Sequence, residues 1–201
     1  MVILITGKND MSEALQKKFA EHGHRVMTAE HAEEIAVLLD GEEKLDMLVT
    51  GICHSPEEKD GDIASGPDWR RAERLYQKNA VESLAALQRA FPYLERGGLK
   101  RICYLSLLGG SINASGEKAG YGIYMSACAV NMQANLLYNR MRKLGYTFRI
   151  FGMEKEAGVG EMASAAYQYF TENRSVDPDS AKHTDENRLV MRNKDGREIP
   201  F

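Results

Sequence analysis

The sequence has little cysteine. Three cysteines are spread over 201 residues, and Cys53, Cys103 and Cys128 form no C-x-x-C pair. Three scattered cysteines are too few for a disulfide framework, and their spacing does not suit a metal site. The five histidines include no pair one helical turn apart with the acidic neighbour that a metalloprotease needs. We therefore expect a protein of the reducing cytoplasm that binds no metal.

Clustered positive charge and long apolar runs are also missing. Lys and Arg total 26 against 29 Asp and Glu, a formal net charge of −3, so the chain has no basic footprint for nucleic acid. The apolar run at residues 2–5 is too short to span a bilayer and lacks the flanks of a signal peptide. We expect no nucleic-acid partner, no membrane anchor and no export segment.

Proline and glycine are present at ordinary levels. The chain has 5 Pro and 18 Gly and no repeat of fixed period, which excludes collagen-like, linker-like and solenoid architectures. With 43% hydrophobic and 27% charged residues, it is long enough to bury a sizeable core. Because no linker or shift in composition divides it, we expect a single domain over residues 1–201.

What the sequence does contain is an alternation of short apolar strands and amphipathic helices. This alternation predicts an α/β fold of three layers, in which helices cover both faces of a doubly wound, Rossmann-like parallel sheet. The polar segment 55–67 reads as a surface loop. The expected strands are residues 2–5, 25–28, 45–49, 101–105, 147–151 and 188–191, and the two longest helices are residues 69–94 and 124–144.

Ligands of an open α/β sheet lie beyond the carboxyl ends of its strands, so the residues at those ends indicate function. Here they include two Thr-Gly pairs, a glutamate after the second strand and a serine after the fourth long strand, with an asparagine and a tyrosine on the two long helices. In this order they resemble the short-chain dehydrogenase/reductase family. The residues that carry the resemblance are Thr6, Gly7, Glu30, Thr50, Gly51, Asn79, Ser106 and Tyr124.

The resemblance implies a catalytic set. It gives Tyr124 the role of general acid/base and Asn79 that of keeping a water chain ordered. The serine that polarises a carbonyl is ambiguous: Ser106 directly follows its strand, Ser111 lies closer to the family's usual distance from Tyr124, and either is equally readable as an ordinary loop hydroxyl. The family's pairing of long helices also implies a homodimer or tetramer through residues 69–94 and 124–144.

The resemblance implies a dinucleotide site as well. It places Thr6, Gly7, Thr50 and Gly51 along NAD(P). Glu30 stands where an acidic group binds the adenosine ribose hydroxyls, which favours NAD over NADP. An alternative is that Glu30 belongs to a solvated acidic stretch with its neighbours.

Three departures from the family pattern bear on chemistry. Met11 and Glu13 occupy the second and third glycine positions of the phosphate-binding turn, which places a bulky side chain and a carboxylate near the pyrophosphate. Cys128 stands one helical turn after Tyr124, where the family has the lysine that lowers the tyrosine pKa. The third departure is a deletion: too few residues separate Glu30 from Thr50 for the family's third strand and one flanking helix.

These observations leave three hypotheses. The first is a family-like protein with an impaired dinucleotide site that acts as a binding or assembly protein, with NAD(H) bound weakly or not at all. The second is a working NAD(H)-dependent oxidoreductase that acts on a carbonyl or alcohol through Tyr124. The third is an enzyme of another class with Cys128 as nucleophile, which lacks a placed base because no histidine occurs between His54 and His183.

Overall fold

The structure is a computed structural model that describes residues 1–52, 63–64, 66–172, 185 and 188–201. Its centre is a seven-stranded sheet in the order β2-β1-β3-β4-β5-β6-β7. Neighbouring strands from β2 to β6 are parallel, and β7 is antiparallel to β6. The strands are β1 (Val2–Thr6), β2 (Arg25–Ala29), β3 (Met47–Gly51), β4 (Arg101–Leu107), β5 (Thr147–Met153), β6 (Met191–Arg192) and β7 (Glu198–Ile199).

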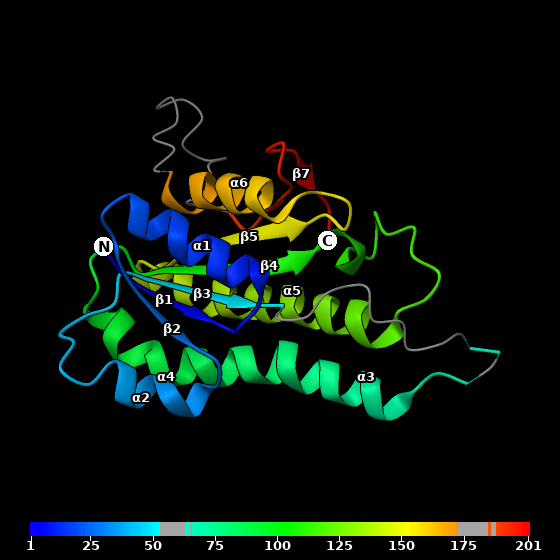
Figure 1. Ribbon diagram of the computed structural model, residues 1–201, viewed down its shortest axis with the longest axis horizontal. Coiled ribbons are helices and arrows are strands. Elements are labelled where there is room, and N and C mark those ends of the chain that lie inside the picture. Colours follow the sequence, from blue (N-terminus) through cyan, green and yellow to red (C-terminus); the bar gives the residue numbers. More distant parts are fainter. Residues whose placement is uncertain (53–62, 65, 173–184, 186–187) are drawn as a thin grey trace.

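Helices cover both faces of this sheet (Figure 1). Two of them share a core cluster with β1 and β3 on one face, and the others pack into a second cluster on the opposite face. This arrangement confirms the three-layer α/β prediction. The first pair is α1 (Asp10–Glu21) and α6 (Val159–Thr171); the second group is α2 (Ile35–Leu38), α3 (Trp69–Tyr76), α4 (Glu82–Arg96) and α5 (Tyr121–Met141).

The central strands are buried on both sides. Every residue of β3 and β4 is buried. Along β4, Ile102 and Tyr104 face the cluster beneath α4 and α5, whereas Cys103 and Leu105 face the cluster beneath α1 and α6. Burial on both faces is why these strands appear in the sequence as continuous apolar runs rather than as alternating patterns.

Strand β2 forms one edge of the sheet. Among the described residues it pairs with β1 alone. Between β2 and β3 the chain forms a 3₁₀ turn at Ala32–Glu34 and the one-turn helix α2. The expected loss of an edge strand and its flanking helix is therefore confirmed.

Some boundaries differ from the sequence prediction. The helix expected at 69–94 contains a π-helical turn, Gln77–Val81, between α3 and α4. The last parallel strand, expected at 188–191, is the two-residue β6, because only Met191 and Arg192 find partners on β5. Most of the loop expected at 55–67 lies outside the described residues.

Candidate functional site

The carboxyl ends of the strands assemble one edge of the sheet. The parallel register places Thr6 beside Ala29, and Gly51 beside Leu105. The chain runs from β1 to β2 in one direction along the sheet and continues at β3 on the other side of β1. A crevice at such a switch point is where open α/β sheets bind ligands, so the sequence-predicted cofactor residues do share one location.

The first turn joins two of these strands. The Thr6 hydroxyl donates to the Thr50 hydroxyl at 2.7 Å, and both residues are buried. Gly7 has a φ of 85°, a backbone conformation that favours glycine, and its amide donates to the Ala29 carbonyl at 2.9 Å. Thr6, Gly7 and Thr50 therefore fix the geometry of β1, β2 and β3 at the crevice.

Helix α1, which follows this turn, is capped by its own side chains. The Ser12 amide donates to Asn9 Oδ1 at 2.9 Å, and the Asn9 amide donates to Ser12 Oγ at 3.0 Å. Met11 is buried in the cluster between α1 and α6. The Asn9 and Ser12 amides, at the helix start where a glycine-rich turn would bind a phosphate, thus already have partners within the chain. Sequence reasoning missed this capping box, although its signal, Asn-x-x-Ser ahead of an apolar stripe, is visible.

A pocket of about 260 Å³ lies at the carboxyl ends of β1 and β2. Glu30 lines it at the position expected from sequence, and the Glu30 amide donates to Glu34 Oε2 at 2.8 Å. Three of the lining side chains are carboxylates and one is a lysine, so the local charge disfavours a diphosphate. The lining residues are Gly7, Lys8, Ser12, Glu13, Gln16, Thr28, Ala29, Glu30 and Glu34.

Tyr124 sits near the start of α5 in a slot between two glycines. A Cβ on Gly109 would lie 2.2 Å from Tyr124 Cε1, and one on Gly120 would lie 2.9 Å from Cε2. Glu117 lines the same pocket as Tyr124. Burial raises the pKa of Tyr124 to about 12, and its interaction with the Glu117 carboxylate adds to the shift. A family-type general base needs the opposite shift.

Cys128 is the residue one turn further along α5. Its Sγ lies 3.1 Å from the Gly110 carbonyl oxygen, to which the thiol donates. Burial raises the pKa of this thiol, so at neutral pH it carries no charge. Cys128 therefore does not lower the pKa of Tyr124 as a lysine ammonium does in the family pattern.

Asn79 lies in the π-helical turn and is fully buried. Its Nδ2 donates to the Ser126 hydroxyl at 3.0 Å, and Ser126 in turn donates to the Ile123 carbonyl at 2.8 Å. These bonds tie the long helix to the first turns of α5. The structure thus places Asn79 next to the helix that carries Tyr124.

Both candidate serines are buried and bond to residues other than Tyr124. The Ser106 hydroxyl donates to Asn131 Oδ1 at 2.7 Å, two turns beyond Tyr124 on α5. The Ser111 hydroxyl donates to the Pro200 carbonyl at 2.5 Å and accepts from the Ala114 amide at 2.9 Å. Neither serine lines the pocket that contains Tyr124.

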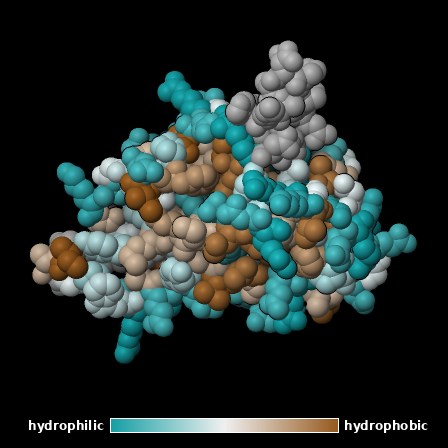
Figure 2. Space-filling model, turned by 180° about the vertical axis from the view of Figure 1, so that it is seen from behind, coloured by the Kyte–Doolittle hydropathy of each residue, from teal (hydrophilic) through white to brown (hydrophobic). Residues whose placement is uncertain are grey.

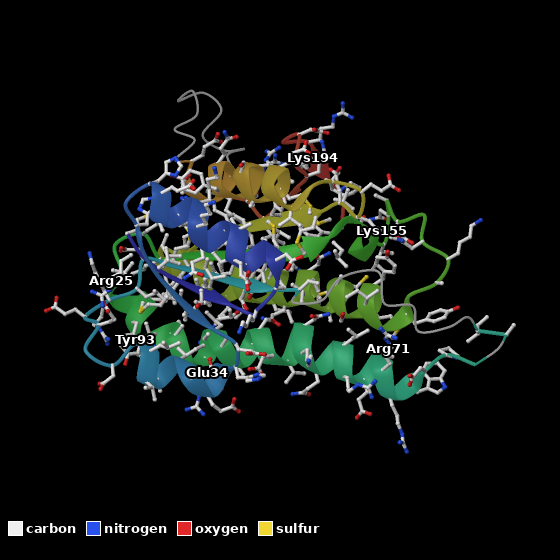
Figure 3. The ribbon with its side chains drawn as sticks, viewed as in Figure 1. Arg25, Glu34, Arg71, Tyr93, Lys155 and Lys194 are labelled. Carbon is white, nitrogen blue, oxygen red and sulfur yellow. The ribbon has the colours of Figure 1, made fainter. Side chains whose placement is uncertain are left out.

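That second pocket, which we call the Tyr124 pocket, also has a volume of about 260 Å³. It lies at the carboxyl ends of β4 and β5, and Figure 3 shows Lys155 in the loop that follows β5. Sequence reasoning missed its charged residues, because they lie in loops without periodicity. The lining residues are Leu107, Leu108, Gly109, Glu117, Tyr124, Met153, Glu154, Lys155 and Glu156.

The sequence matches no family model and no curated protein. Solved structures do match. The carbonyl reductase Sniffer of D. melanogaster aligns with a TM-score of 0.72 at 14% identity, covering 100% of this chain and 99% of that chain. An oxidoreductase of the short-chain dehydrogenase/reductase family from Brucella ovis, in complex with partially ordered NAD, aligns with a TM-score of 0.66 at 18% identity. The alignment covers 85% of this chain and 93% of that chain. The NADPH-bound carbonyl reductase from chicken fatty liver aligns with a TM-score of 0.66 at 15% identity, covering 99% of this chain and 87% of that chain.

At these identities the likeness establishes the fold. The chain has the Rossmann-like fold of short-chain dehydrogenases/reductases, as its sequence motifs predict. Within the described residues, none of the helices is both long and apolar enough to cross a lipid bilayer.

Proposed function

We propose that this chain is a short-chain-dehydrogenase-like protein that acts mainly by binding and assembly, with little or no dehydrogenase activity. The observation that carries the proposal is the surroundings of Tyr124. A neutral thiol stands one turn away in place of an ammonium, and burial together with the Glu117 carboxylate raises the pKa of the tyrosine instead of lowering it. Losing a preorganised charge of this kind costs roughly 2–4 kcal/mol of transition-state stabilisation.

The turn before α1 supports the same proposal, because it fits a dinucleotide poorly. Asn9 and Ser12 satisfy amides at the start of the helix, and Glu13 lines the adjacent pocket. A diphosphate would have to displace the cap and approach a carboxylate, both of which oppose binding. We therefore assign no chemical step to NAD(P).

A second candidate is an active NAD(H)-dependent oxidoreductase that acts on a carbonyl or alcohol through Tyr124. Glu30 favours it, because this carboxylate lines the first pocket at the end of β2, where an adenosine ribose would bind. The Brucella ovis neighbour, which has the same fold, is described in complex with NAD.

Calorimetric titration with NAD, NADH, NADP and NADPH separates the two candidates. The proposal expects no tight binding of any of them. Tight binding, coupled to dehydrogenase turnover that disappears in Tyr124→Phe, would establish the oxidoreductase instead. Activity that survives in Tyr124→Phe would exclude this tyrosine as the acid/base.

The proposed assembly is a homodimer or tetramer through residues 69–94 and 124–144. An apolar groove of about 370 Å³ lies between α4 and α5, and Leu84 and Leu136 on these helices are 48% and 62% exposed. Hydrophobic surface also gathers across the middle of the molecule seen from behind (Figure 2). The groove is lined by Leu84, Leu87, Gln88, Phe91, Leu137, Arg140, Met141 and Leu144.

Light scattering after size exclusion tests this assembly. We expect a mass above that of one chain, and a reduced mass in Leu136→Glu, because a carboxylate in an apolar interface is costly to bury. Val37→Glu is the matched control, since Val37 is 79% exposed on α2, outside the groove. A wild-type monomer at high concentration would contradict the assembly. A cytoplasmic location is also part of the proposal, because Cys103 and Cys128 are both free thiols.

A further inference from the structure

The Tyr124 pocket has an unusual balance of polar groups. Its apolar wall is formed by Leu107, Leu108 and Met153, and its polar side chains come from two loops and the start of α5. Three of these polar side chains are carboxylates. A ligand that fits this pocket must therefore place hydrocarbon against one wall and satisfy several oxygen acceptors on the other.

Tyr124 adds to the acceptors. Its phenol oxygen carries lone pairs that accept hydrogen bonds, and burial and the Glu117 carboxylate raise its pKa, which keeps the phenol protonated. A carbonyl ligand would bring one more acceptor into a pocket that three carboxylates already line.

Glu154 independently indicates a ligand that donates a hydrogen bond. Its Oε1 atom is shielded from solvent and has no hydrogen-bond partner among the described residues. A buried carboxylate oxygen without a donor is costly. Because Glu154 lines the Tyr124 pocket, a donor on a bound ligand would relieve that cost.

The charge of the pocket also favours a ligand that donates hydrogen bonds. The lining contains one lysine, Lys155, and three carboxylates, which belong to Glu117, Glu154 and Glu156. Within the described part of the chain, none of residues 154–156 forms a side-chain hydrogen bond or an ion pair. The net negative charge of this lining repels an anionic ligand and attracts a cationic one.

A metal ion is a poor candidate for this cation. The described residues contain no group of three His, Cys, Asp or Glu side chains close enough together to hold one. The apolar wall would also contribute nothing to a metal, but it suits the carbon skeleton of an organic cation.

We propose that the Tyr124 pocket binds a small aliphatic amine in its ammonium form. Its nitrogen donates to Glu154 and to the Tyr124–Glu117 pair, and its hydrocarbon packs on Leu107, Leu108 and Met153. The inference goes beyond the proposed function, since it concerns this pocket alone. It holds whichever way the dinucleotide titration comes out.

Calorimetric titration of the full chain with three probes of similar shape tests the proposal: cyclohexylammonium chloride, cyclohexanol and sodium cyclohexanecarboxylate. We expect the ammonium to bind and the neutral and anionic probes to bind at least roughly tenfold more weakly, because only the ammonium offers a positively charged N–H donor to the carboxylates. Equal binding of cyclohexanol, stronger binding of the carboxylate, or no binding of the ammonium would overturn the proposal.

Glu154→Gln assigns the site. This variant keeps the shape of the side chain but not its charge, and we expect roughly tenfold weaker binding of cyclohexylammonium. Glu43→Gln is the matched control, since Glu43 is exposed before β3, and it should bind like the wild type. Because Glu154→Gln removes the charge of a carboxylate whose Oε1 atom lacks a donor among the described residues, we expect its melting temperature to equal or exceed that of the wild type, which separates lost binding from lost folding. Unchanged binding in this variant would overturn the assignment.

Discussion

The two pockets at the carboxyl edge of the sheet differ in how their polar groups are satisfied. At the start of α1, Asn9 and Ser12 meet each other's amides, so the donors there have partners within the chain. In the Tyr124 pocket, Glu154, which directly follows β5, has an Oε1 atom that lacks a donor among the described residues. The side chains of the first region hydrogen-bond to each other, whereas the second region has an oxygen atom that a ligand could satisfy. Two proteins that share this fold can therefore bind ligands in different parts of the crevice.

The largest expected effect comes from closing the slot around Tyr124. In Gly109→Ala the added Cβ lies 2.2 Å from the tyrosine ring, and Gly120 blocks the opposite side. We expect a loss of roughly 1–3 kcal/mol in the free energy of unfolding, as for other overpacked sites, together with loss of cyclohexylammonium binding. Urea denaturation measures the first effect and calorimetry the second. Gly116→Ala, in the same loop with nothing within 4 Å of the added Cβ, should change neither.

The next effect tests whether the α1 cap is structural. Asn9→Ala removes the acceptor for the Ser12 amide, and we expect it to lower the free energy of unfolding by about 1 kcal/mol. Lys8→Ala, at the neighbouring position, is the control. A variant as stable as the wild type would mean that the cap contributes little. Dinucleotide binding gained by Asn9→Ala would show that the cap was what excluded the phosphate.

The smallest effect concerns the coupling of Glu117 to Tyr124. Burial and the Glu117 carboxylate together raise the pKa of Tyr124 to about 12. Because the raised pKa favours the protonated phenol in the folded state, this group stabilises the protonated protein, and the stability falls as the pH rises from about 10 towards 12. In Glu117→Gln the pKa should fall back towards 10.

Ultraviolet difference titration against Tyr124→Phe isolates this phenol from the other tyrosines. The wild-type difference curve should have its midpoint above that of Glu117→Gln. Coincident curves would show that Glu117 does not control the pKa of Tyr124, and that the two side chains do not act together on an amine ligand.

Much of the fold could be predicted from the sequence because the central strands are buried on both faces. The apolar runs that mark β3 and β4 correspond to strands in which every residue is buried. The π-helical turn at Gln77–Val81 could not be predicted, since no residue type there signals an added backbone residue. The two-residue β6 depends on its partner β5 and not on local propensity.

The candidate site was predictable only in part. Motif order located Thr6, Glu30 and Tyr124, because strand ends and helix starts are local features. It did not locate Glu117 or Glu154, whose meeting in one pocket depends on how two loops fold over the sheet. It likewise gave no sign that Ser106 and Ser111 donate to Asn131 and Pro200, since these bonds join residues far apart in the chain.

The edge strand β2 has a consequence for handling the protein. One side of this strand makes no pairing with any described residue, so its main-chain groups form a template on which another extended chain can add. Arg25, which is ion-paired with Glu42, and the exposed Thr28 place polar side chains along this rim. Concentrated samples of variants that remove this polarity should form fibrillar aggregates before they lose their helical structure.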